Sequence, residues 1–224
     1  MKQAVVSSPA ADVQPAGNKE HHYYGWMRGD LLVYVPSSTR NVLSVGCGGG
    51  TTEAELIKND VSVVGIELDQ SAAERARDRG IEVIVGDASK IDDELGSRRF
   101  DCIMYADVLE HIADPVAVLQ RHVKRLDPGG TVIISVPNFR HYSVFWQLFV
   151  RGHVHYRDAG IFDRTHLRLT TRRMIMEWLG QVGLDVVTFH LKLGPRRRFL
   201  SYCTLGLTRE FLAKQLIVVG RKPG

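Results

Sequence analysis

Short apolar runs alternate with amphipathic stretches along most of the chain. Five runs rich in β-branched residues predict strands at Asn41–Val45, Val61–Glu67, Ile81–Val85, Asp101–Tyr105 and Thr131–Val136. The stretches between them predict helices at Thr51–Lys58, Ser71–Arg79 and Pro115–Leu126. Because the strands are apolar on both faces, the pattern predicts a parallel sheet covered by helices on both sides.

Turn and cap residues divide these elements. Ser71 is expected to cap the second helix and Gly80 to end it. The run Asp127–Gly130 (DPGG) is expected to form a turn before the fifth strand.

The alternation breaks after Pro137. Residues 138–170 are rich in His, Arg and aromatic side chains, and we interpret them as an insertion with a helix over Tyr142–Val150 followed by a loop. Beyond it, Thr171–Gln181 is expected to be helical. Leu184–Leu191 and Ala213–Gly220 then resemble a closing hairpin of two strands at the sheet edge.

Length and composition place these elements in one globular domain. A chain of 224 residues suits a single α/β domain over 21–224, preceded by a flexible leader at 1–20 that is rich in Ala, Ser, Pro and Gly. Three widely spaced cysteines give no disulfide framework, which favours a cytoplasmic location. No segment reaches the roughly 18 apolar residues of a membrane span.

The net charge of +4 conceals an asymmetry between the two halves of the chain. Residues 1–110 hold 11 Lys and Arg against 18 Asp and Glu, whereas residues 111–224 hold 18 against 7. The second half is therefore expected to present a positive face. Such a face suits an anionic partner, although a solvated basic surface with no partner fits equally well.

Five glycine-rich or acidic segments accompany the predicted strands in order. They are Gly46–Gly50, Glu67, Gly86–Ala88, Asp107–His111 and Asp127–Gly130. Parallel α/β sheets bind nucleotide-like cofactors at the carboxyl ends of their strands. Glycines there let the backbone approach the ligand, Glu67 can accept hydrogen bonds from ribose hydroxyls, and Asp87 can accept one from an adenine amine.

A glycine loop alone would also fit a dinucleotide site. Here the loop reads GCGGG and not GxGxxG, which argues against NAD. In combination, the motifs VLSVGCGGG, VVGIELD, VGDA, FDCIMYADVLEHI and LDPGGTVIISVPN resemble those of class I S-adenosylmethionine (SAM)-dependent methyltransferases, over about residues 23–183. That resemblance implies a Rossmann-like, mainly parallel seven-stranded α/β sheet with an antiparallel last strand and helices on both faces.

The same resemblance implies a set of SAM-binding residues. They are Tyr24, Arg28, Gly46, Cys47, Gly48, Glu67, Leu68, Asp87, Ala88 and Asp107. The three loop residues would line the methionine part, Glu67 would hold the ribose, Asp87 and Ala88 the adenine, and Asp107 would form the wall beside the sulfonium. Tyr24 and Arg28 would belong to an N-terminal lid whose arginine meets the cofactor carboxylate.

One position departs from the family pattern. The family usually carries an acid two residues before the first loop glycine, where it helps to organise the methionine ammonium group, and here that residue is Ser44. The departure implies either weaker binding or replacement by another acid.

The acceptor side offers three groups of candidates. Methyl transfer is an in-line displacement, and a hydroxyl acceptor benefits from a general base such as histidine. His111 follows the fourth strand, and Asp163 precedes His166 in GIFDRTHLR, where a carboxylate can hold the imidazole in its basic tautomer. His155, Tyr156 and Arg168 are expected to contact the acceptor, which can be anionic. A packing role is the alternative for each histidine, and no metal-ligand set is recognised.

The segment RGHVHYRDAGIFDRTHLRLTT carries a second resemblance. It resembles methyltransferases found beside bacterial cell-surface glycan genes and, more loosely, the methionine-biosynthesis accessory proteins called MetW. The first similarity implies O-methylation of a small-molecule acceptor, most simply a sugar or glycan precursor, with a natural-product O- or N-methyltransferase as the nearest alternative.

Two further readings stay open. Arg196–Arg198 and the basic second half would suit a nucleic-acid methyltransferase, which we consider less favoured because no added RNA-binding domain accompanies them. The MetW similarity and Ser44 would suit a non-catalytic regulatory partner. The basic insertion and its aromatic residues also make a homodimer conceivable.

Overall fold

Seven strands form one sheet in the computed structural model, which describes residues 27–194, 204 and 208–224. The strands are β1 (Asn41–Val45), β2 (Ser62–Glu67), β3 (Glu82–Val85), β4 (Phe100–Ala106), β5 (Leu126–Pro137), β6 (Asp185–Lys192) and β7 (Gln215–Arg221). The leader at 1–20, Tyr24 and Arg196–Arg198 lie outside the described residues.

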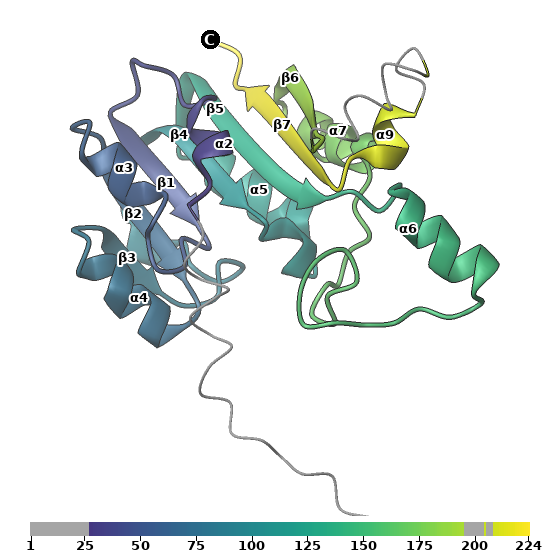
Figure 1. The fold of residues 1–224 in the computed structure, drawn as a ribbon. Helices are drawn as coiled ribbons and strands as arrows, with labels where there is room; N and C mark the ends of the chain where they lie inside the picture. Colours follow the sequence, from purple (N-terminus) through teal and green to yellow (C-terminus); the bar gives the residue numbers. More distant parts are fainter. Residues whose placement is uncertain (1–26, 195–203, 205–207) are drawn as a thin grey trace, which may run out of the picture.

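The strand order is β3-β2-β1-β4-β5-β7-β6 (Figure 1). Neighbouring strands from β3 to β5 are parallel, and β7 runs antiparallel to both β5 and β6. This confirms the predicted fold class, including the antiparallel last strand. The expected closing pair is also present, but of its two strands only β6 lies at a sheet edge, because β7 lies between β5 and β6.

Helices cover the two faces of the sheet separately. The short helices α2 (Gly29–Leu32) and α3 (Glu53–Ile57) and the longer α4 (Gln70–Arg77) pack on one face, and α5 (Pro115–Val123) and α7 (Arg172–Gln181) pack on the other. Because strand residues alternate between two buried clusters, both faces need apolar side chains. The nearly continuous apolar runs of the sequence follow from this arrangement.

Two local predictions are wrong. The N-cap of α4 is Asp69 rather than Ser71: its Oδ1 accepts a hydrogen bond from the Ala72 backbone N–H at 2.6 Å, and the Ser71 hydroxyl donates to the same oxygen. An ionised Asp is at least as good a cap as Ser, so the cap moves back by two residues.

The second correction concerns the end of α5. That helix stops at Val123, and β5 already begins at Leu126, which pairs with Phe100. The expected DPGG turn is therefore part of the strand, where it forms an irregularity in the pairing with β4.

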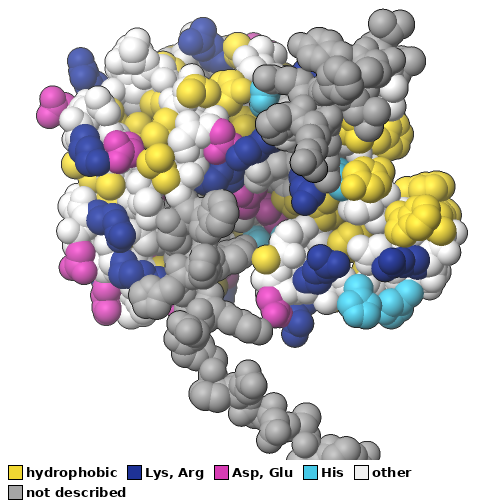
Figure 2. Space-filling model, in the orientation of Figure 1, with side chains coloured by type: hydrophobic (Ala, Val, Ile, Leu, Met, Phe, Trp, Pro, Cys, Tyr) yellow, Lys and Arg dark blue, Asp and Glu magenta, His cyan; other side chains and the backbone are white. Residues whose placement is uncertain are grey.

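The insertion forms a lobe beside the sheet. It contains α6 (Tyr142–Phe145), the π-helical segment η3 (Trp146–Val150) and a loop that returns to α7. Figure 2 shows apolar side chains gathered on this lobe, and Phe145 and Phe149 are 58% and 75% exposed. The short helices η1 (Asp93–Leu95), η2 (Leu109–His111) and α9 (Arg209–Leu212) complete the described elements.

Among the described residues, no helix combines the length and apolar character that crossing a bilayer requires.

Gly46 follows β1 directly, and its backbone conformation forms the turn into the glycine loop. Its φ is +69°, and a Cβ built on it would lie 2.2 Å from Cγ2 of Val108, in the turn after β4. The absent side chain therefore lets the turns after β1 and β4 meet.

We expect Gly46→Ala to lower the free energy of unfolding by more than Gly129→Ala. Gly129 has a similar φ of +75° but nothing within 4 Å of an added Cβ, so alanine there costs only the backbone strain of about 1–2 kcal/mol. At Gly46 overpacking adds roughly 1–3 kcal/mol. Urea unfolding of both variants measures the difference, and equal losses would contradict the close approach.

Candidate functional site

A cleft of about 1320 Å³ opens at the carboxyl ends of the parallel strands. Its lining includes nine of the ten residues expected to bind the cofactor: Arg28, Gly46, Cys47, Gly48, Glu67, Leu68, Asp87, Ala88 and Asp107. The tenth, Tyr24, lies outside the described residues. Ligand pockets commonly measure ~300–1,000 Å³, so this cleft has room for a cofactor and a second molecule.

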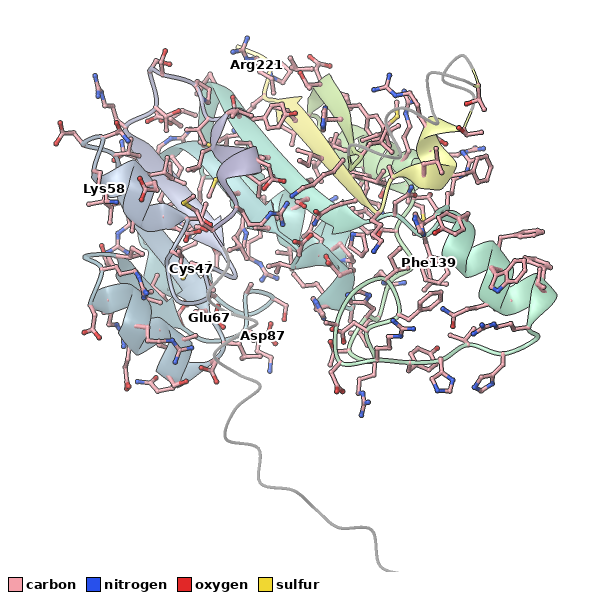
Figure 3. All side chains as sticks on the ribbon, viewed as in Figure 1. Cys47, Lys58, Glu67, Asp87, Phe139 and Arg221 are labelled. Carbon is pink, nitrogen blue, oxygen red and sulfur yellow. The ribbon has the colours of Figure 1, made fainter. Side chains whose placement is uncertain are left out.

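The glycine loop is held against Glu67 at the end of β2. The Glu67 carboxylate accepts hydrogen bonds from the Gly48 N–H at 2.7 Å and from the Asp69 N–H at 2.9 Å. Each carboxylate oxygen has a second lone pair, so Glu67 can still accept from ribose hydroxyls. Cys47 lies buried beside it, and burial raises the pKa of its thiol, so a structural role suits Cys47 better than a nucleophilic one (Figure 3).

Asp87 follows β3 at the rim of the cleft. Its Oδ1 accepts a hydrogen bond from the Ser89 N–H at 2.9 Å, and hydrogen bonding by Ser89 holds the pKa of Asp87 below its ordinary value. The carboxylate is exposed and ionised at neutral pH, so it can accept a hydrogen bond from an exocyclic amine. Figure 3 shows Asp87 near Glu67, at the same end of the sheet as Cys47.

A buried acid that sequence reasoning missed lies behind the loop. Glu53, at the start of α3, lines the cleft and is only 3% exposed. Its Oε1 accepts a hydrogen bond from the Ser44 hydroxyl at 2.6 Å. Burial raises the pKa of Glu53 although the bond from Ser44 lowers it, and the nearby Glu67 raises it further. Two carboxylates, Glu53 and Glu67, therefore line the cleft near Cys47, and neither is ion-paired with a basic side chain among the described residues.

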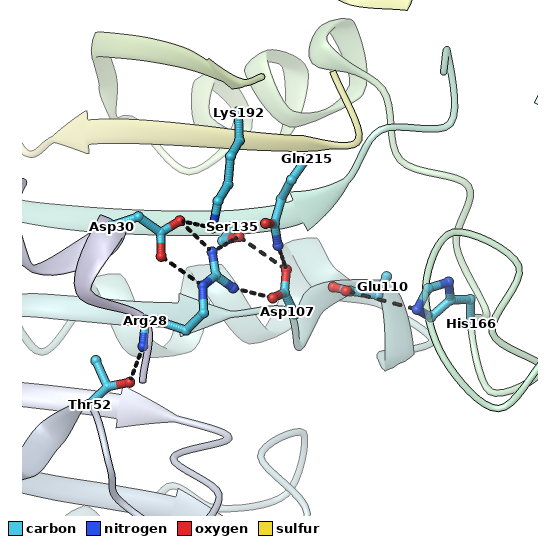
Figure 4. Close-up of polar contacts among 9 residues, drawn as sticks. All are labelled: Arg28, Asp30, Thr52, Asp107, Glu110, Ser135, His166, Lys192 and Gln215. Carbon is cyan, nitrogen blue, oxygen red and sulfur yellow. Dashed lines mark hydrogen bonds and ion pairs between the residues drawn. The ribbon is translucent and has the colours of Figure 1, made fainter. Parts of the chain in front are cut away.

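Arg28 and Asp107 both line the cleft and form an ion pair with each other (Figure 4). The Arg28 guanidinium also pairs with Asp30 and donates to the Ser135 hydroxyl at 3.0 Å. Gln215 donates to Asp107 at 2.5 Å. The expected lid arginine and the expected sulfonium wall are thus bonded to each other.

Asp107 is held in an unusual backbone conformation, with φ at +59°. Non-glycine residues adopt this region rarely, and they often do so at functional sites. Here the hydrogen bonds from Ser135 and Gln215, together with the ion pair to Arg28, stabilise the turn after β4.

The acceptor side of the cleft is formed where the insertion returns to the sheet. The backbone carbonyl of Glu110 accepts hydrogen bonds from the N–H groups of Leu167 and Arg168 at 2.8 and 3.0 Å. These bonds bring His166 next to His111, with ring centroids 4.8 Å apart. Both imidazoles line the cleft, as predicted for candidate catalytic residues. Burial, and then His166, lower the pKa of His111, which keeps this imidazole neutral.

Asp163 lines the cleft but does not pair directly with His166 as expected. Its Oδ1 accepts from the backbone N–H and the hydroxyl of Thr165, at 2.9 and 2.6 Å. Thr165 in turn contacts Nδ1 of His111 through its hydroxyl at 3.1 Å. The tight turn aims the carboxylate at the residue two positions on, so Asp163 orients His111 through Thr165. Nδ1 of His166 faces the carbonyl of Ile161 instead.

The three residues expected to contact the acceptor lie outside the cleft lining. His155 is exposed and its N–H bonds to Gln147, Tyr156 is 64% exposed, and the Arg168 guanidinium bonds to the carbonyl of Ala113. Their expected role therefore stays a prediction. The insertion lines the cleft with residues 157–166 in their place.

Glu110 is the second acid that sequence reasoning missed. Its side chain is 1% exposed, Oε1 lies 4.0 Å from Nε2 of His166, and Oε2 has no hydrogen-bond partner among the described residues. Burial, with Asp107 nearby, raises the pKa of Glu110 well above its ordinary value. The segment Leu109–His111 points to its histidine alone, because a single sequence does not reveal that Glu110 is buried.

Comparison with known proteins connects this geometry to two groups of relatives. The family model for the methionine biosynthesis protein MetW matches residues 30–182. The ubiquinone biosynthesis O-methyltransferase of Alkalilimnicola ehrlichii is 33% identical over 104 residues, covering 44% of this chain and 42% of that protein. The mitochondrial ubiquinone biosynthesis O-methyltransferase of Candida albicans is 31% identical over 161 residues, covering 68% and 48%. The chain thus spans less than half the length of these curated relatives.

Solved structures share the fold. A SAM-dependent methyltransferase from Archaeoglobus fulgidus superposes with a TM-score of 0.67 at 17% identity, covering 87% of this chain and 92% of that one. One from Mesorhizobium loti gives a TM-score of 0.63 at 18% identity, covering 91% and 100%. The predicted resemblance to class I methyltransferases is confirmed, and so is the looser one to MetW.

Proposed function

This chain belongs to the MetW family, and we propose that it binds SAM in the cleft and transfers the methyl group to a hydroxyl of a small molecule. The observation that carries the proposal is the convergence of nine expected cofactor residues on one cleft beside the His111–His166 pair.

The acids around the glycine loop support a cationic ligand at this place. SAM carries an ammonium and a sulfonium group, and Glu53 and Glu67 line the cleft together with Cys47. We propose that Glu53 supplies the acid that the family pattern places at Ser44. Its hydrogen bond from Ser44 brings a carboxylate from α3 to the point where β1 would otherwise provide one.

Arg28 suits the cofactor carboxylate, provided that one of its present contacts opens. Its guanidinium is already neutralised by Asp30 and Asp107. A third carboxylate there would be repelled unless Arg28 leaves Asp107, while Lys192 continues to balance Asp30 at 2.8 Å. Once Arg28 has moved away, the Asp107 carboxylate would also be free to face the sulfonium.

On the acceptor side, we propose that His111 and His166 activate the hydroxyl, with Asp163 holding His111 through Thr165. A neutral imidazole activates a hydroxyl by accepting its proton as the new O–C bond forms. Nδ1 of His111 is engaged by Thr165 and Nδ1 of His166 by Ile161, which leaves both Nε2 atoms for this role.

The acceptor itself is proposed to be a sugar or glycan precursor. Residues 151–171 support this choice because they resemble a segment of methyltransferases found beside bacterial cell-surface glycan genes. Arg157 and Lys214 line the cleft and would attract an anionic group such as a phosphate. The O-methyltransferase names of the curated relatives support a hydroxyl as the reacting group. A cytoplasmic location and a homodimer stay predictions.

The family description favours a second candidate function. The matching model describes a methionine biosynthesis protein and not an O-methyltransferase. Under this second hypothesis the chain binds SAM and regulates a partner enzyme without transferring a methyl group itself. SAM binding combined with the absence of methyl transfer to any acceptor would separate this reading from the first.

We expect Glu53→Gln to weaken SAM binding by about tenfold or more, because a charge-assisted bond to the ammonium group, worth roughly 1.5–3 kcal/mol, is lost. Glu55→Gln is the matched control: Glu55 lies on the same helix but is paired with Lys58 at the surface. Calorimetric titration with SAM measures both variants. Equal affinities would remove Glu53 from the site.

We expect His166→Ala to abolish methyl transfer while SAM affinity changes little. The unmodified chain is first assayed for S-adenosylhomocysteine release with phosphorylated and nucleotide-linked sugars, and the best acceptor is used for the variant. His153→Ala, at an exposed histidine outside the cleft, is expected to retain full turnover. Loss of SAM binding in His166→Ala would instead assign His166 a structural role.

A further inference from the structure

We propose that Glu110, His111 and His166 bind one divalent transition-metal cation at the acceptor end of the cleft. One ligand atom from each residue lies within 4.8 Å of the others. The site itself does not depend on the proposed function, but its role in activating an acceptor hydroxyl does.

Among the described residues, no partner of the Glu110 carboxylate explains its burial. It comes from η2, lies between Asp107 and His166, and leaves Oε2 without a hydrogen bond among the described residues (Figure 4). Buried carboxylates are normally paired, hydrogen-bonded or bound to a metal. No Lys or Arg is ion-paired with Glu110 within the described part of the chain, and His166 lies at 4.0 Å.

The two imidazoles are oriented as metal ligands usually are. Nδ1 of His166 lies 3.3 Å from the carbonyl oxygen of Ile161, and Nδ1 of His111 lies 3.3 Å from that of Thr165. A proton on each Nδ1 would be donated to these oxygens, which leaves each Nε2 with its lone pair free. Such outer bonds from the second ring nitrogen to a carbonyl fix the tautomer and orientation of metal-binding histidines.

The spacing allows a cation after a small contraction. Metal–ligand bonds of about 2.0–2.2 Å place neighbouring ligand atoms about 3–3.5 Å apart, so the side chains must close by roughly 1 Å. Two imidazoles and one carboxylate favour Mn²⁺, Fe²⁺, Co²⁺ or Zn²⁺ over Ca²⁺ or Mg²⁺, which prefer oxygen ligands alone. Three protein ligands leave open positions that face the cleft.

An open position would serve the acceptor. A hydroxyl oxygen bound to the cation would have a lowered pKa, would pass its proton to water in the cleft, and would be held beside Asp107, where the sulfonium is proposed to lie. Its oxygen would then form the new bond to the methyl carbon as the bond from that carbon to sulfur breaks. With the cation bound, both Nε2 lone pairs are held by the metal, so the histidines act as ligands. Without the cation they act as the bases proposed above. This reading also explains why Glu110 is buried between Asp107 and the histidine pair, a position that direct base catalysis does not require.

The test is a titration of the full-length chain, stripped with a chelator, with Co²⁺ followed by visible absorption. We expect one saturable site with ligand-field bands. His166→Ala and Glu110→Gln should each weaken Co²⁺ binding at least tenfold. His153→Ala is the matched control and should leave binding unchanged. His153 and His155 form another imidazole pair, 5.2 Å between ring centroids, on an exposed loop outside the cleft.

Two results would overturn the proposal: no saturable Co²⁺ binding, or a saturable site that neither cleft variant weakens. If His166→Ala fails to fold, His166→Gln keeps the test, since it removes the imidazole but preserves polar bulk. Titration of the same samples with SAM distinguishes the two proposals. SAM binding without Co²⁺ binding would refute the metal site alone, and Co²⁺ binding without SAM binding would refute the cofactor site alone.

Discussion

The reversal of strand order between β1 and β4 is the constraint on which the site depends. From β1 the chain builds the sheet outward through β2 and β3, and it then returns to place β4 on the other side of β1. The loops after these two strands diverge, which opens a crevice at their carboxyl ends. Gly46 lets the turns after β1 and β4 come into contact at Val108. The glycine loop, Glu67, Asp87 and Asp107 reach one cleft because of this topology.

A second contact supplies the other half of the cleft. Two backbone hydrogen bonds to the Glu110 carbonyl hold the end of the insertion against the turn after β4. They bring His166 to His111 across 55 residues of sequence. The same turn holds Asp107, which is proposed to face the cofactor, and Glu110, which contacts the insertion. One short segment therefore lies between the proposed positions of SAM and the acceptor. Among the described residues, the buried Oε2 of Glu110 has no hydrogen-bond partner, and a bound cation or acceptor would supply one.

The sheet could be predicted well because each strand is marked by an apolar run within its own stretch of sequence. β1 has the expected bounds, and the insertion helix spans the expected residues. Where two residues compete for one role, the prediction failed, as for Asp69 over Ser71 at the α4 cap. Glu53 and Glu110 escaped notice because their importance comes from burial and from partners far along the chain. The direct Asp163–His166 pair failed because a tight turn directs that carboxylate to Thr165.

The most direct test of the central claim is a crystal structure of the full-length chain with S-adenosylhomocysteine at saturating concentration. We predict adenine at Asp87, the ribose on Glu67, the ammonium group near Glu53, and the thioether sulfur facing His111 past Asp107. An empty cleft, or a ligand bound with its adenine at the histidine pair, would contradict the account.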